Sequence, residues 1–296
     1  MASLDAILPA LQSILVSGLV LASLYALMAI GLSLVWTTLG VFNFAHGVFM
    51  TLGAYIAWTV ADDRGLGFGL AAGFAVAVAA VAGLGVLADK LLVSPFLGRK
   101  DIVLIAVMTT LSAAFFLENA ALLIWGPRIK QLDKLVEGNV RLAGVPISAH
   151  EFVIILLAPL VLFALWAFLK FSWIGAAIRA VAQNRDAALL VGIDVRLAYS
   201  VAFALSAGLA GMAGVLLGAI RFITPGMGAE PLLKAFIVVI LGGLGSFAGT
   251  AVGAYAVGFL ESSSTYFVGA YWTQAILFAL FILILILRPT GLLGRR

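Results

Sequence analysis

Long runs of apolar residues alternate with short polar connections along most of this chain. Each run approaches the roughly 20 residues that a helix needs to cross the hydrocarbon core of a bilayer. The pattern predicts membrane spans over residues 11–36, 44–60, 68–87, 102–125, 151–171, 197–220, 232–260 and 271–287. A glycine-rich stretch, Gly242-Gly243-Leu244-Gly245-Ser246, interrupts the run 232–260. We therefore expect an all-α fold, a polytopic transmembrane helix bundle of about eight spans, or nine if the interrupted run crosses twice, with broken or re-entrant segments.

The composition indicates that lipid surrounds most of the chain. Apolar residues make up 64% of the 296 residues and charged residues only 10%, whereas a soluble domain carries about 25% charged residues. The 32 glycines fit closely packed membrane helices, because small residues let helix backbones approach one another. We expect residues 1–296 to form a single transmembrane domain.

The chain lacks the sequence signals of several other functional classes. It has no cysteine, which excludes a disulfide framework and a thiolate metal site. Its net charge of +4 is spread over short loops, so we expect no nucleic-acid partner. It contains no Gly-x4-Gly-Lys-Ser/Thr sequence for binding ATP, and neither His46 nor His150 has a carboxylate cluster beside it. We therefore expect no cofactor and no enzyme activity in this chain.

The basic residues predict the orientation in the membrane. They gather in three segments, which contain Lys90, Arg99 and Lys100, then Arg179, Arg185 and Arg196, then Arg288, Arg295 and Arg296. The positive-inside rule places all three in the cytoplasm, which puts the C-terminus inside and the N-terminus outside. The loop 126–150 also carries four basic residues and argues against this topology, but the other three segments agree with one another.

The segment 38–47 holds an amide, an imidazole and two glycines between apolar spans. Irregular backbone at membrane depth is tolerated where protein buries it or where it lines a wet cavity. One interpretation is a broken helix whose end faces a translocation pathway. The other is an ordinary turn in which Asn43 caps a helix and His46 bonds a backbone carbonyl. The residues alone leave both open.

The connection 171–197 contains an amphipathic pattern over residues 174–191. Its apolar side holds Ile178, Val181, Ala182 and Leu189, and its polar side holds Arg179, Gln183, Asn184, Arg185 and Asp186. Gly192 is a natural helix stop. Such a helix could lie on the membrane surface, dock into a groove on a partner, or serve only as a solvated connection.

Small residues recur at four-residue intervals in three predicted spans: Ala210, Gly214 and Gly218, then Gly249 and Gly253, then Gly69, Gly73 and Ala77. We expect these faces to form close helix contacts. The glycine-dense stretch 235–253 is either a re-entrant hairpin that lines a pathway or a crowded helix crossing. Because the predicted spans hold few titratable groups, we do not expect an ion-driven pump, and energy for uphill transport would have to come from a partner.

Four segments together resemble the branched-chain amino-acid ABC transporter permease family, the LivH-type subunits of bacterial inner membranes. They span almost the whole chain in family order: residues 40–47 with 52–55, residues 175–188 with 192–194, residues 241–246, and residues 288–294. The chain departs from the family pattern at Val48, where an acidic residue is common, and at Ala248, where proline is common.

The resemblance implies a permease in a bacterial plasma membrane that imports branched-chain amino acids, or a related amide, urea or aromatic acid, by ATP-driven alternating access. It implies a second homologous permease subunit or a second copy of this chain as a partner. Two cytoplasmic ATPase subunits, which bind ATP and Mg, and an extracytoplasmic solute-binding protein would complete the transporter. A self-sufficient secondary transporter or channel is the alternative, and a membrane-embedded enzyme is disfavoured because no catalytic cluster is visible.

The resemblance also suggests roles for residues in two groups of segments. The ATPase-coupling loop would be about 171–197, with Arg179, Gln183, Asn184, Arg185, Asp186 and Gly192 as its candidate coupling residues. The translocation pathway would be lined by Asn43, His46, Gly47, Gly242, Gly243, Gly245 and Ser246.

Overall fold

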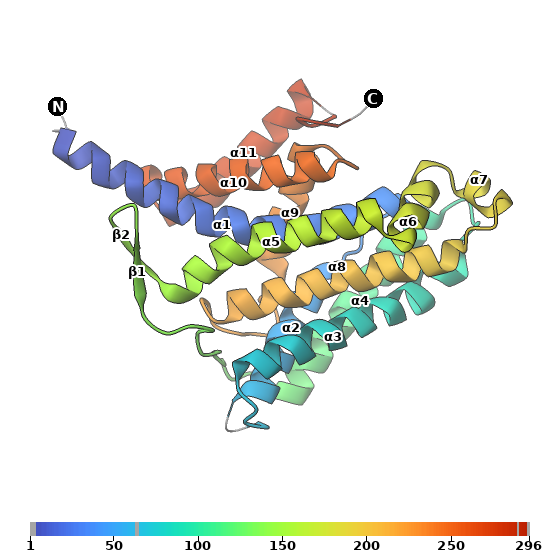
Figure 1. Ribbon diagram of the computed structural model, residues 1–296, viewed down its shortest axis with the longest axis horizontal. Helices are drawn as coiled ribbons and strands as arrows, with labels where there is room; N and C mark the ends of the chain where they lie inside the picture. The colour runs from blue at the N-terminus through green and yellow to red at the C-terminus, as the bar shows by residue number, and fades with distance from the viewer. Residues whose placement is uncertain (1–3, 63–64, 289, 295–296) are drawn as a thin grey trace.

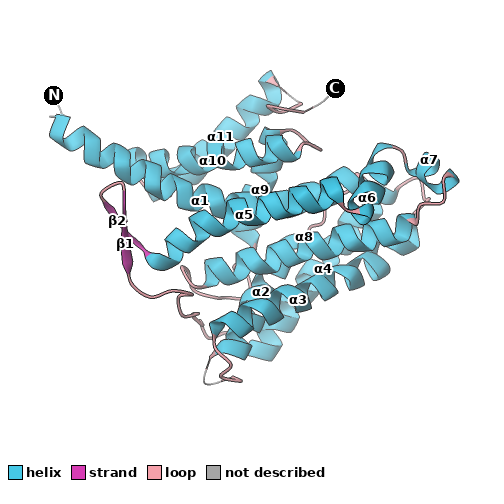
Figure 2. Cartoon of the chain, in the orientation of Figure 1, coloured by secondary structure: helices cyan, strands magenta, loops and turns pink. Residues whose placement is uncertain are grey.

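The computed structural model describes residues 4–62, 65–288 and 290–294. These residues form a helix bundle with one short β-hairpin at its edge (Figures 1 and 2). In chain order the elements are α1 (Leu4–Leu39), α2 (His46–Ala61), α3 (Leu70–Ala88), α4 (Ile102–Trp125), β1 (Asn139–Leu142), β2 (Val145–Ser148), α5 (Ala149–Phe171), α6 (Trp173–Gln183), α7 (Arg185–Leu190), α8 (Val195–Gly218), α9 (Ala229–Gly242), α10 (Phe247–Val268) and α11 (Ala270–Leu287). A π-helical turn (Asp89–Val93) and a 3-10 turn (Ser94–Phe96) extend α3.

The predicted spans are confirmed as helices. In the described part of the chain, six helical stretches are long and apolar enough to cross a membrane: Leu8–Leu39, Leu70–Phe96, Ile102–Trp125, Ala149–Phe171, Val195–Gly218 and Ala270–Leu287. The interrupted run contains two helices, α9 and α10. Helix α9 has 14 residues and is about 21 Å long, which is shorter than the roughly 30 Å hydrocarbon core.

The bundle has two ends, which lie at the left and right of Figure 1. We call the left one the hairpin end, because it holds β1 and β2, and the right one the tail end, because it holds α6, α7 and residues 290–294. At the hairpin end, Leu132 N donates to Gly218 O and Lys130 pairs with Ile223. At the tail end, Leu292 N donates to Leu241 O. This arrangement separates the loops 126–150 and 171–197 as the predicted topology requires.

Helices α1, α2 and α8 form the interior of the bundle. Residues 22–35 of α1 are buried almost continuously, because α10, α8, α5 and α9 pack around that helix. Helices α3, α4, α5 and α11 instead leave large apolar side chains exposed, such as Phe116 and Leu123 on α4. Such surfaces are stable against lipid or against another membrane subunit.

The predicted small-residue faces form close helix contacts, with one exception. A Cβ atom built on Gly214 would overlap the carbonyl group of Met50, so α8 lies directly against α2 there. Gly249 and Gly253 likewise face the backbone of α9. The exception is Gly69, which faces open space and precedes α3 with a φ of +81° instead of contributing to a contact.

One connection contains strands that the apolar pattern does not predict, and one expectation about a connection needs correction. The loop 126–150 contains an antiparallel hairpin, turned by Ala143 and Gly144 at φ values of +48° and +83°. Its strands have four residues each, too few for alternation to be recognised. The single amphipathic helix over 174–191 is two helices, since Asn184 ends α6 and begins α7 by accepting a bond from Ala187 N. The break leaves Leu189 half exposed, away from the buried side chains of Ile178 and Val181.

Candidate functional site

Helix α2 begins inside the bundle instead of at its end. Helix α1 stops at Leu39, and Gly40, at a φ of +70°, turns the chain back along it. Asn43 then starts α2, because its Oδ1 accepts from Ala45 N at 3.0 Å and its carbonyl accepts from His46 N at 3.2 Å. Asn43 therefore caps the start of α2, although it lies two residues before Ala45, the residue directly preceding the helix. Asn43 is buried, and its Nδ2 has no hydrogen-bond partner in the described structure.

His46 fixes the depth at which α2 begins. Its Nε2 lies 3.0 Å from the carbonyl oxygen of Met28, which precedes the end of α1 by about three turns, roughly 16 Å. Its Nδ1 lies 3.3 Å from Ser206 Oγ at the middle of α8. A ring nitrogen that faces a carbonyl must carry the proton, so the neutral imidazole donates to Met28 and accepts from Ser206. The fully buried ring therefore ties α1, α2 and α8 together.

Helix α9 also begins at this depth. The loop after α8 enters the bundle, and Gly228 N donates to Thr51 Oγ1 on α2 at 3.1 Å. A Cβ atom built on Gly47 would lie 2.7 Å from the Gly228 carbonyl oxygen, so the starts of α2 and α9 are in contact. From there α9 runs steeply across the direction of α1 and α8 (Figure 1). Two short helices thus start near the middle of the bundle, where irregular backbone is shielded by protein.

The other predicted pathway segment, the break between α9 and α10, lies at the tail end. Gly243 and Gly245 take φ values of +105° and +85°, and Ser246 caps α10 by accepting from Gly249 N at 3.0 Å. Leu293 N of the tail donates to the carbonyl of Gly242 at 3.0 Å. Among the residues that the structure describes, no hydrogen bond joins this break to Asn43 or His46.

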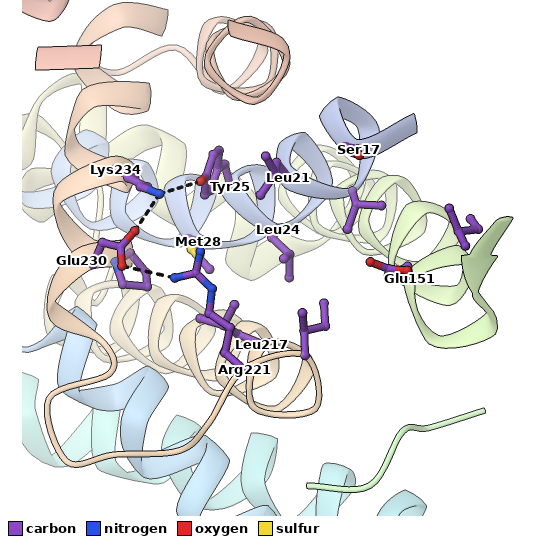
Figure 3. Close-up of a pocket in the computed structure, with 14 residues that line it drawn as sticks. Ser17, Leu21, Leu24, Tyr25, Met28, Glu151, Leu217, Arg221, Glu230 and Lys234 are labelled. Carbon is purple, nitrogen blue, oxygen red and sulfur yellow. Dashed lines mark hydrogen bonds and ion pairs between the residues drawn. The ribbon is translucent and has the colours of Figure 1, made fainter. Parts of the chain in front are cut away.

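A buried group of charges lies on the other side of α9. Lys234 Nζ is 2.7 Å from Glu261 Oε1 of α10 and 2.8 Å from Glu230 Oε1 one turn away. It also donates to the hydroxyl of Tyr25 on α1 at 3.1 Å, and that hydroxyl donates to Glu261 Oε2 at 2.5 Å. Figure 3 shows Lys234 between Tyr25 and Glu230. The ammonium group thereby links α1, α9 and α10.

The charges continue towards the hairpin end. Arg221, just beyond α8, bonds Glu230 Oε2 through Nη1 at 3.2 Å. The side chains of Lys234 and Glu261 are about nine-tenths buried, whereas those of Arg221 and Glu230 are 50% and 45% exposed. Two cations and two carboxylates therefore form one neutral group that leads from the interior to an accessible surface.

That surface belongs to a cavity of about 250 Å³ between α1, α5, α8 and α9 (Figure 3). Its lining residues are Ser17, Val20, Leu21, Leu24, Tyr25, Met28, Ile147, Glu151, Leu217, Ile220, Arg221, Glu230, Pro231 and Lys234. Ile147 and Glu151 lie at the hairpin end, and Met28 is the residue whose carbonyl His46 binds. The cavity thus reaches from the hairpin end to the depth at which α2 and α9 begin.

The sequence patterns do not predict this site. The predicted spans hold few titratable groups, and neither Lys234 nor Glu261 is among the candidate residues. The available signal was that Lys234 lies inside an apolar run, since a charge at membrane depth is costly and is usually functional. Its partners Tyr25 and Glu261 could not be paired from the sequence, because they are 209 and 27 positions away.

The predicted coupling residues form an exposed polar surface at the tail end. Arg179, Gln183, Asn184, Asp186 and Gly192 are exposed, and Arg185 is half-buried. Ser172, Asn184 and Asp194 cap α6, α7 and α8, and Gly192 ends α7 at a φ of +81°. The buried side chains of Ile178 and Val181 attach this surface to the bundle.

A bundle that carries a charge-lined cavity and two helices starting at mid-depth is the architecture of a membrane transport protein. Comparison with known proteins agrees with this class. Residues 14–285 match the family described as the permease component of branched-chain amino acid transport systems. The chain belongs to this family of membrane permeases.

Two relatives match over nearly their whole length. The high-affinity branched-chain amino acid transport permease BraD of Pseudomonas aeruginosa is 34% identical, covering 95% of each chain, and LivH of Escherichia coli K12 is 33% identical, covering 94% of each. The ribose import permease RbsC of E. coli K12 is 28% identical, covering 90% of this chain and 82% of that protein. No solved structure shows a significant match.

Proposed function

We propose that this permease imports branched-chain amino acids, or a related small polar solute such as an amide, urea or an aromatic acid, by ATP-driven alternating access in a bacterial plasma membrane. The observation that carries the proposal is a cavity that extends from the hairpin end to a floor at Met28, which His46 holds in place. A cavity that ends at the middle of the bundle supports this proposal, because it would form one half of an alternating-access pathway and open towards the other side when its floor moves. The names of the relatives BraD and LivH support the choice of solute.

The tail end is the cytoplasmic side in this proposal, and with it the C-terminus. The positive-inside rule supports this orientation. The hairpin end then faces the extracytoplasmic solute-binding protein. A second permease subunit, homologous or identical, would cover part of the exposed apolar surface, and two ATPase subunits would bind ATP and Mg outside this chain.

The exposed surface of α6 and α7 is the proposed contact with an ATPase subunit. Its candidate residues remain Arg179, Gln183, Asn184, Arg185, Asp186 and Gly192. Closure of the ATPases would push this surface and alter the packing of the bundle. Asn43, His46 and Gly47 would control the floor of the cavity, whereas Gly242, Gly243, Gly245 and Ser246 would line the tail end of the pathway.

The test begins with purification of the tagged chain from its native membrane in mild detergent. Recovery of P-loop ATPases and a second permease subunit is expected, followed by ATP-dependent uptake of leucine after reconstitution with the binding protein. Asp186→Arg should raise the ATP hydrolysed per solute moved at least severalfold. Asp133→Arg, an equally exposed substitution at the hairpin end, is the matched control and should leave that ratio unchanged. Gradient-driven uptake by the chain alone would establish a secondary transporter or channel instead.

A further inference from the structure

The cavity beside Lys234 has walls of two kinds. The α1 wall is largely apolar, with Val20, Leu21 and Leu24. The remaining walls hold charged groups from three other elements: Glu151 from α5, Arg221 after α8, and Glu230 with Lys234 from α9. Figure 3 shows Glu151 on the far side of the cavity from Lys234, whereas Arg221 lies beside Glu230. An apolar surface with a few convergent polar groups is typical of a small-molecule site.

The charged side chains on these walls differ in how far their hydrogen-bonding groups are already paired within the protein. Lys234 is bonded to Glu230, Glu261 and Tyr25 and is almost completely buried, so its bonds stabilise the wall of the cavity. Arg221 uses only Nη1 in its bond to Glu230, which leaves further guanidinium donors on a half-exposed side chain. Glu151 has no cation within salt-bridge distance among the described residues. Its Oε2 accepts from Ser148 N at 2.9 Å as part of a capping box.

We propose that this cavity is a solute-binding site of the permease for a zwitterionic amino acid with an aliphatic side chain. Arg221 binds the carboxylate, Glu151 binds the ammonium group, and the side chain lies against Leu21 and Leu24. This inference rests on the proposed function and extends it, because it places solute selection in the permease itself.

The placing of these charges favours a zwitterion over a simple anion or a neutral polyol. Without solute, Arg221 is paired with Glu230, so no accessible cation of the cavity lacks a partner. A bound amino acid supplies a carboxylate for Arg221 and an ammonium group for Glu151, while Glu230 keeps its bond to Lys234. A simple anion would leave Glu151 uncompensated, and a neutral polyol would place hydroxyl groups against Val20, Leu21 and Leu24 of the α1 wall.

The test measures equilibrium binding to the purified transporter complex without nucleotide and without the solute-binding protein. The ligands are leucine, 4-methylpentanoate, which lacks the amine, and 3-methylbutylamine, which lacks the carboxylate. Glu151→Gln should weaken leucine binding about tenfold while leaving 4-methylpentanoate binding within about twofold. Arg221→Gln should weaken leucine binding similarly while sparing 3-methylbutylamine. Glutamine still supports a capping box, so Glu151→Gln preserves the start of α5.

Two further variants test occupancy of the cavity without changing charge. Ile220→Trp should fill the space at the rim and lower leucine affinity at least tenfold, whereas Ile220→Leu should retain it. Arg128→Gln, on the exposed loop before the hairpin, is the charge control. Leucine affinity unchanged by Glu151→Gln, Arg221→Gln and Ile220→Trp, in a complex that still imports leucine, would overturn the site but leave the proposed function standing. A wild-type complex that imports no amino acid would overturn both.

Discussion

Lys234→Met is the substitution that most directly probes what holds the middle of the bundle together. Methionine is of similar length, so the change removes the charge and its three bonds while keeping most of the packing. Glu230 retains Arg221 as a partner, but Glu261 retains only the hydroxyl of Tyr25. The substitution therefore leaves a nearly buried carboxylate without a cation.

The expected magnitude follows from that unpaired carboxylate. Removing one member of a buried ion pair costs about 3–5 kcal/mol, mainly because the remaining charge stays desolvated. Lys234→Met should therefore lower the free energy of unfolding by about that amount. The double variant Lys234→Met/Glu261→Gln removes both charges and should recover more than half of the loss, because a neutral amide is far less costly to bury.

The assay is equilibrium unfolding of the purified chain in mixed micelles titrated with sodium dodecyl sulfate. Wild type, both single variants and the double variant complete a double-mutant cycle, and a coupling energy of at least about 2 kcal/mol is expected between Lys234 and Glu261. A loss below about 1 kcal/mol for Lys234→Met, or a double variant no more stable than the single one, would refute the bridging role of this ammonium group.

Two other substitutions test contacts at the depth where α2 begins. Gly214→Ala should destabilise the chain by about 1–3 kcal/mol in the same unfolding assay, because the added methyl group overlaps the backbone of Met50; Gly83→Ala, whose Cβ meets open space, is the control and should be neutral or slightly stabilising. His46→Ala removes the bonds to Met28 and Ser206 and should change the apparent affinity or the turnover of solute uptake by the reconstituted transporter at least fivefold; unaltered kinetics would leave the imidazole with a purely structural role in the turn.

The helices were predictable because each long apolar run can satisfy its backbone in lipid only as a helix. The α4 prediction, residues 102–125, agrees with the structure at both ends. The depth at which a helix begins was not predictable. Nothing local indicates that the chain after Leu39 turns back to Met28, because that position is set by the bonds of His46 to two other helices.

The amphipathic connection shows where periodicity stops being informative. Ile178 and Val181 are buried as the helical spacing predicts. Leu189 is not, because Asn184 interrupts the helix and changes the phase of the pattern beyond it. An asparagine with a side chain able to cap a new helix is the local signal for such a break. The charges of the cavity escaped prediction for a different reason, since their pairing depends on the packing of α1, α9 and α10.

The position of α1 suggests how the proposed coupling surface could act on the cavity floor. At the tail end α6 packs against α1, and Ile178 and Arg179 share a cavity with Leu34 and Thr38. About two to four turns further along α1 lie Met28, bound to His46, and then Tyr25, bound to Lys234. These two contacts are on successive turns of one stiff helix. A push on α6 that shifts α1 along its axis would therefore strain the floor and the charged wall together, so opening of the floor and loss of solute affinity would be linked in a single step.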